Sequence, residues 1–272
     1  MDYEIKGVRP ENGYNVIDFD WLDEVRHEMH YYVVREDGKW VLGNPVDVVT
    51  REWDHYETEH LVFRYPAYVD INLHMDEIER MDLECARMLD ALEIELQRRI
   101  EFYKVASPEE SGRLVCFPPA NGYAVVQKSD RPNDPPWFNV AVSTSFNNPH
   151  EVMHVLTAIA GIPCVNAAFC EGYAVAFGGT TYQNPGFALV QTRNLIDDPS
   201  FIGLESLRTM GDTGFLRSSY ITYQEAGSFM RSAIDAFGIT RLRQVCDELV
   251  KGTELGDAFE KSCGTPPMST SG

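Results

Sequence analysis

Apolar residues recur every three or four positions in several long stretches of the chain. Between Met75 and Arg98 this spacing predicts a long amphipathic helix. The same spacing predicts a series of helices further along the chain, at 149–160, 167–177, 220–237, 240–250 and 254–263. The C-terminal half is therefore expected to be mainly helical.

Shorter apolar runs bounded by turn residues predict strands in the first half of the chain. Four such runs lie at 60–65, 99–105, 122–126 and 138–142. Two more, 31–34 and 40–42, flank Asp37-Gly38, a dipeptide typical of a tight hairpin turn. A mixed sheet followed by a helical half indicates the α+β class.

The pattern divides the chain into three parts. Residues 1–55 are expected to form an N-terminal accessory region that contains the β-hairpin. Residues 56–264 would form the main domain, in which an N-terminal mixed β-sheet and its long helix precede the helical half. Residues 265–272 are expected to be a flexible tail.

Composition and charge exclude several partners. The 272 residues carry a formal net charge of −19, so nucleic acids and anionic membranes are not expected to bind. No apolar run reaches the roughly 20 residues that a membrane span needs. The first residues lack the basic and then apolar pattern of a secretory signal. A cytoplasmic protein is therefore the default expectation, and an exported protein without its leader is the alternative.

Six cysteines are scattered along the chain without a CxxC pair. This density is far below that of small disulfide-rich domains, so most of them are expected to be buried free thiols. Cys164 and Cys170 lie close together in the sequence and are the pair that could form an exception.

His150 and His154 lie four positions apart in a predicted helix, with Glu151 next to the first. Residues at this spacing share one helix face, so both imidazoles can bind one Zn²⁺. Glu151 points in a neighbouring direction, from which it can reach a water at the metal without binding the metal. This is the HExxH pattern of zinc peptidases, whose glutamate is the general base. Two surface histidines on an amphipathic helix are the alternative explanation.

Glu171 is expected to be the third ligand, because catalytic zinc takes three protein ligands and keeps one open position. It lies in the next predicted helix, among small and apolar neighbours, where an unpaired carboxylate would be unfavourable. The loop between the helices contains Gly161 and Pro163, and its length allows the second helix to fold back. The strand at 137–143 runs up to the histidine helix and is expected to lie at the cleft edge, where an extended substrate could pair with it.

At these positions the sequence resembles the gluzincin metallopeptidases, in particular the peptidase MA-like domains with an HExxH…EGxA signature. The resemblance rests on His150-Glu151-Val152-Met153-His154 and on Glu171-Gly172-Tyr173-Ala174. A weaker similarity of apolar residues, glycines and aromatics adds the segments 58–65, 223–242 and 256–264. Roughly residues 56 to 264 are covered.

The resemblance implies a thermolysin-like zincin fold for the main domain. It also implies that His150, His154 and Glu171 bind zinc and that Glu151 is the catalytic base. Gluzincins usually add a tyrosine or histidine that stabilises the oxyanion, and no histidine follows His154 here. That role would fall to Tyr223, with Tyr220 as second choice. A core aromatic is the alternative for either tyrosine.

The expected function is that of a zinc-dependent hydrolase, a metallopeptidase acting on a peptide or small amide substrate. One alternative is a zinc hydrolase that acts on a small non-polypeptide amide or a modified natural product. The other is a non-catalytic binding module with a vestigial metal site. A fourth ligand would favour the binding module, and the sequence offers no fourth ligand.

Overall fold

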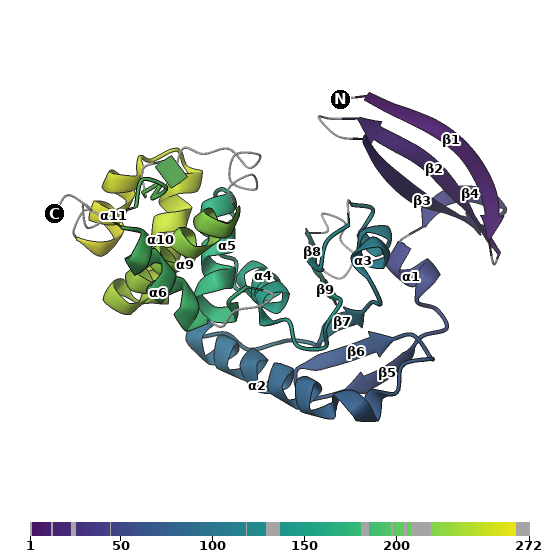
Figure 1. The fold of residues 1–272 in the computed structure, drawn as a ribbon, viewed down its shortest axis with the longest axis horizontal. Coiled ribbons are helices and arrows are strands. Elements are labelled where there is room, and N and C mark those ends of the chain that lie inside the picture. Colours follow the sequence, from purple (N-terminus) through teal and green to yellow (C-terminus); the bar gives the residue numbers. More distant parts are fainter. Residues whose placement is uncertain are drawn as a thin grey trace. The chain divides into compact units, whose positions relative to one another are not determined.

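The computed structural model describes residues 2–11, 13–22, 26–43, 45–117, 119–128, 137–180, 185–196, 198–203, 206–207 and 219–264, with the backbone alone at 2, 21–22, 26–27, 126–128, 137–139 and 219–220 (Figure 1). The fold is α+β with two sheets, so the predicted class is confirmed. The chain divides into two compact units. The first contains Met1–Glu79, Arg99–Gln127 and Phe138–Asn147, and the second contains Arg80–Arg98, Lys128–Trp137 and Asn148–Gly272. The predicted boundary at residue 55 stays a prediction.

The first unit begins with an antiparallel four-stranded sheet in the order β1-β2-β3-β4. Its strands are β1 (Asp2–Glu11), β2 (Tyr14–Leu22), β3 (Arg26–Glu36) and β4 (Lys39–Gly43). Asp37 and Gly38 both have positive φ between β3 and β4, so the predicted hairpin is confirmed. The short helix α1 (Pro45–Val49) follows and buries Val46 and Val48.

The second sheet has the order β5-β6-β7-β9-β8. Its strands are β5 (Asp54–Glu57), β6 (Leu61–Tyr65), β7 (Ile100–Lys104), β8 (Gly122–Lys128) and β9 (Trp137–Ser143). The sheet is mixed, since β5 pairs antiparallel with β6, whereas β6–β7 and β7–β9 are parallel. Because β9 lies between β7 and β8, the expectation that this strand edges a cleft is wrong. The edge strands of the described sheet are β5 and β8.

Two helices follow strands of this sheet along the chain. Helix α2 (Met75–Leu92) ends six residues before the predicted Arg98. It stops because Glu93 takes positive φ and the Ile94 amide donates to the Leu89 carbonyl, which is the hydrogen bond of a Schellman end. Helix α3 (Pro108–Val115) begins at Ser107, whose hydroxyl accepts a hydrogen bond from the Glu110 amide.

The described part of the second unit is helical apart from connecting segments (Figure 1). Its helices are α4 (Pro149–Ile159), α5 (Ala167–Gly178), α6 (Pro185–Leu195), α9 (Ser219–Phe237), α10 (Ile239–Val250) and α11 (Leu255–Cys263). The predicted helices are confirmed to within a residue or two, and α6 was not expected. The predicted tail at 265–272 lies outside the described residues.

Helices α5 and α9 approach each other closely at small residues. A Cβ atom at Gly172 would lie 3.0 Å from the Ala226 carbonyl oxygen, and one at Gly227 would lie 2.3 Å from the Val175 side chain. Larger residues would push the two helices apart. Glu171 directly precedes Gly172, so the crossing holds its helix turn against α9.

Candidate metal centre

His150 and His154 project from the same face of α4, as the spacing predicts. The helix begins at Asn148, whose side chain accepts from the Glu151 amide, with Pro149 at the first position. The two imidazole rings are nearly perpendicular, with centroids 4.9 Å apart. His150 is buried and His154 is half-buried, so one side of the pair faces the interior.

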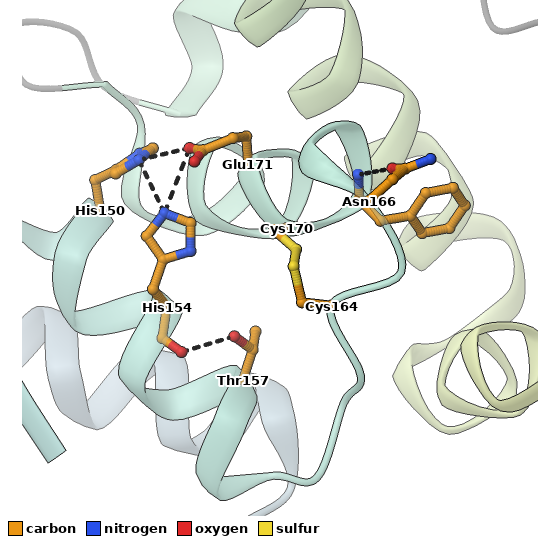
Figure 2. The surroundings of a disulfide bond; sticks show 8 residues. His150, His154, Thr157, Cys164, Asn166, Cys170 and Glu171 are labelled. Carbon is orange, nitrogen blue, oxygen red and sulfur yellow. Dashed lines mark hydrogen bonds and ion pairs between the residues drawn. A yellow bond between two sulfur atoms is a disulfide. The ribbon is translucent and has the colours of Figure 1, made fainter. Parts of the chain in front are cut away.

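Glu171 reaches both histidines from the neighbouring helix α5 (Figure 2). Its Oε2 lies 3.0 Å from His150 Nε2 and 3.3 Å from His154 Nε2, and the two Nε2 atoms are 3.2 Å apart. Among the described residues, this is the group of three whose ligand atoms converge closely enough to hold a metal ion. The structure therefore brings together the three residues predicted as ligands.

The separations of the three ligand atoms fit a tetrahedral metal. Zinc bonds of about 2.0–2.2 Å place neighbouring corners of a tetrahedron about 3.3–3.6 Å apart. The observed 3.0–3.3 Å differ from this by only a few tenths of an ångström. Two nitrogens and one oxygen form a donor set typical of catalytic zinc, with one corner left for water.

The hydrogen bond made by the other nitrogen of His150 supports the same interpretation. Nδ1 lies 2.7 Å from the carbonyl oxygen of Gly179, which can only accept, so Nδ1 carries a proton. In the neutral ring the Nε2 lone pair then faces the Glu171 carboxylate, which is also an acceptor. Two facing acceptors need a cation between them, either a proton or a metal ion.

Burial and mutual charge shift the pKa values at the centre. Burial alone would lower the pKa of His150, but the hydrogen bond to Glu171 and the charges of Glu151 and Glu171 raise it to about 9. Burial opposes ionisation of Glu171, yet hydrogen bonds to both histidines hold its pKa far below the ordinary value. In the metal-free protein a proton on His150 therefore takes the place of the cation.

Glu151 lies beside this cluster and is not one of its three converging residues. Burial raises the pKa of its carboxyl group, against the opposing charges of His150 and His154. A carboxylate with a raised pKa next to a metal-binding cluster is suited to accept a proton from water.

Tyr223 of α9 contacts the cluster through its ring, which stacks on His150 with centroids 6.0 Å apart and an interplanar angle of 23°. Burial raises the pKa of Tyr223 well above its ordinary value, and so do the charges of Glu171 and Glu151 and a hydrogen bond to Glu171. The hydroxyl stays protonated and can donate. Of the two candidate tyrosines, Tyr223 is at the centre, and the side chain of Tyr220 lies outside the described residues.

Two supporting groups were missed by the sequence analysis. One is the Gly179 carbonyl, which a glycine pair at a helix end signals only weakly. The other is Glu225, a buried carboxylate of α9 that accepts hydrogen bonds from the amides of Ile202 and Gly203 at 2.8 and 2.9 Å. Ile202 and Tyr223 pack against the same buried cluster, so Glu225 ties the 202–203 segment to the helix that carries Tyr223.

Cys164 and Cys170 form a disulfide next to the cluster (Figure 2). This is the pair that the sequence indicated as the exception to free thiols. Four cysteines are free thiols: Cys85, Cys246 and Cys263 are buried, as expected, whereas Cys116 is half-buried. Cys170 directly precedes Glu171, so the disulfide lies one residue from a predicted ligand.

Comparisons with known proteins give no match: no family model matches the chain, and no curated protein or solved structure is significantly similar to it. The resemblance to gluzincins therefore stays a prediction from the sequence. None of the helices in the described part of the chain is long and apolar enough to cross a membrane.

Proposed function

We propose that the protein is a zinc-dependent hydrolase that cleaves amide bonds in peptides, with a gluzincin-type site in a thermolysin-like fold. The observation that carries the proposal is the convergence of His150 Nε2, His154 Nε2 and Glu171 Oε2 at 3.0–3.3 Å. This donor set suits zinc and leaves a position for water. The order of a mixed sheet followed by a helical half supports the fold assignment.

The metal site, Glu151 and Tyr223 each have a separate role in the proposed hydrolysis. When bound, zinc would lower the pKa of a coordinated water towards about 7 and polarise the substrate carbonyl. Glu151 takes the proton of the attacking water and later delivers it to the leaving amine. Tyr223 donates a hydrogen bond to the substrate oxygen as negative charge develops on it.

A purely structural metal site has weaker support. Structural zinc sites are closed by four protein ligands, whereas the cluster found among the described residues has three. Glu151 is held beside the cluster although burial penalises its charge. A structural site gives this carboxylate no role, whereas hydrolysis requires a base at that place.

The metal content of the purified protein, with and without added zinc, tests the proposal. We expect about one zinc ion per chain in the wild type, as a single three-ligand site implies. Glu171→Ala should lose most of it. Glu260→Ala, at an exposed glutamate of α11, is the matched control and should keep it. A wild type without zinc, or a zinc content that is unchanged in Glu171→Ala, would contradict the proposed site.

A further inference from the structure

We propose that the Cys164–Cys170 disulfide positions the metal ligand Glu171, so that opening this bond weakens zinc binding. The inference rests on the zinc site proposed above. Figure 2 shows the disulfide joining the segment between α4 and α5 to the helix turn that carries Glu171. The bond therefore acts on the backbone of the ligand and does not touch the metal.

Other ties between this segment and the start of α5 are few. The segment leaves α4 at Gly161, which has positive φ, and the Ile162 amide donates back to the Thr157 carbonyl. Within the part of the chain that the structure describes, residues 163–165 make no backbone–backbone hydrogen bond. Asn166 caps α5 by accepting from the Phe169 amide at 3.0 Å. The disulfide is the covalent restraint on this turn.

Glu171 is sensitive to the state of this turn because it is only the fifth residue of α5. Helix ends open more readily than helix centres, since their first amides lack helical partners. A metal ligand must lie within about 0.2 Å of its bonding distance. Glu171 directly follows Cys170, so a displacement of this turn when the bond opens would move the carboxylate by more than that, while His150 and His154 stay on α4.

The bond is accessible to a reductant, since Cys164 is exposed and Cys170 is half-buried. Reduction by a water-soluble phosphine breaks the Sγ–Sγ bond and yields two thiols. The phosphine supplies the two electrons and becomes a phosphine oxide, with its oxygen and the two protons coming from water. The redox state of the protein's surroundings would thus set how tightly zinc is held.

The zinc dissociation constant, measured by competition with a chromogenic chelator, tests the inference. We expect Cys164→Ser/Cys170→Ser to bind zinc about tenfold more weakly than the oxidised wild type, the lower end of the effect of groups that orient a ligand. Serine replaces both residues because a lone thiolate beside Glu171 would itself bind zinc. Cys116→Ser is the matched control, at a free and half-buried cysteine of the first unit, and should bind normally.

A double-mutant cycle separates positioning from general destabilisation. In the Glu171→Ala background, removal of the disulfide should cost no further zinc affinity, because the ligand that it positions is gone. An equal loss in both backgrounds would overturn the inference. A second arm does not depend on the serine variant: the folded wild type is reduced with the phosphine, and its freed thiols are blocked with iodoacetamide so that they cannot bind zinc themselves. It should show the same tenfold loss, and unchanged affinity with both thiols blocked would overturn the inference as well.

The failure of this inference and that of the proposed function give different results. A wild-type protein that binds no zinc removes the site and the inference with it. A wild type that binds zinc as tightly as the double-serine variant leaves the site in place and overturns only the role of the disulfide.

Discussion

A Cβ atom at Gly178 would lie 2.6 Å from the backbone nitrogen of His150, so the end of α5 rests directly on the start of α4. The next residue, Gly179, accepts the Nδ1 proton of His150 at 2.7 Å. Helix α5 therefore contributes twice to the centre, through the Glu171 carboxylate and through the carbonyl that orients His150. Outer partners of this kind fix the tautomer of a metal-binding histidine.

Gly178→Ala is expected to damage both stability and metal binding, because the new methyl group meets backbone that cannot turn away. We expect a loss of about 1–3 kcal/mol in the free energy of unfolding, typical of overpacking, and weaker zinc binding. Denaturant unfolding and a zinc titration measure the two effects. Gly256→Ala is the control, since a Cβ there meets nothing within 4 Å. Equal behaviour of the two variants would contradict the close packing at Gly178.

Glu151→Gln is expected to keep zinc and lose activity. Glutamine preserves the size of the side chain but cannot accept the proton of water, so kcat for peptide hydrolysis should fall by about 10²–10⁴-fold. Zinc content and kcat, measured on the same preparation, check both statements. Glu260→Gln controls for the loss of a glutamate charge at an exposed position. Turnover retained in Glu151→Gln would assign the base to another group.

Local periodicity explains which elements the sequence could predict. The helices α2, α4, α9, α10 and α11 carry apolar stripes that become buried, and each was expected. Strands β1 and β2 were not expected. In β1 much of the apolar surface stays exposed, as at Tyr3, Ile5 and Val8. Helix α6 was not predicted either, because it buries little: Ala188 is its buried residue. An element that buries little leaves little pattern.

Relationships between distant segments were harder to predict. The pair His150 and His154 follows from one helix, whereas the approach of Glu171 depends on how α5 folds back at small residues. The order of strands in the second sheet has no local signal, so the place of β9 between β7 and β8 was missed. The Gly179 carbonyl is a main-chain group, so no side chain in the sequence could indicate its role.

Tyr223→Phe is expected to lower kcat and leave zinc content unchanged. The hydroxyl would donate to the developing negative charge, and removal of one such donor typically costs about 10²–10³-fold in kcat. KM should change little, because the hydrogen bond strengthens only in the transition state. Tyr220→Phe is the comparison. A larger loss in Tyr220→Phe than in Tyr223→Phe would transfer the oxyanion role to Tyr220.

Zinc binding is expected to weaken as the pH falls below about 9, because the metal must displace the proton held by His150. In the metal-free protein the pKa of this imidazole is raised to about 9 from its ordinary 6.5. Below that pH the bound proton competes with zinc, so the dissociation constant should rise by up to about tenfold for each pH unit lost.

The same shift stabilises the metal-free fold, by linkage, with the contribution full below the ordinary pKa of 6.5 and lost as the pH rises through about 9. Zinc titrations at several pH values, with calorimetry in two buffers of different ionisation enthalpy, measure the affinity and the released proton. Glu171→Gln removes the charge-assisted hydrogen bond that contributes most to the raised pKa of His150 and leaves the charge of Glu151, so the metal-free variant should lose most of this pH-dependent stability. A zinc affinity that is independent of pH across this range would show that no proton occupies the metal's place.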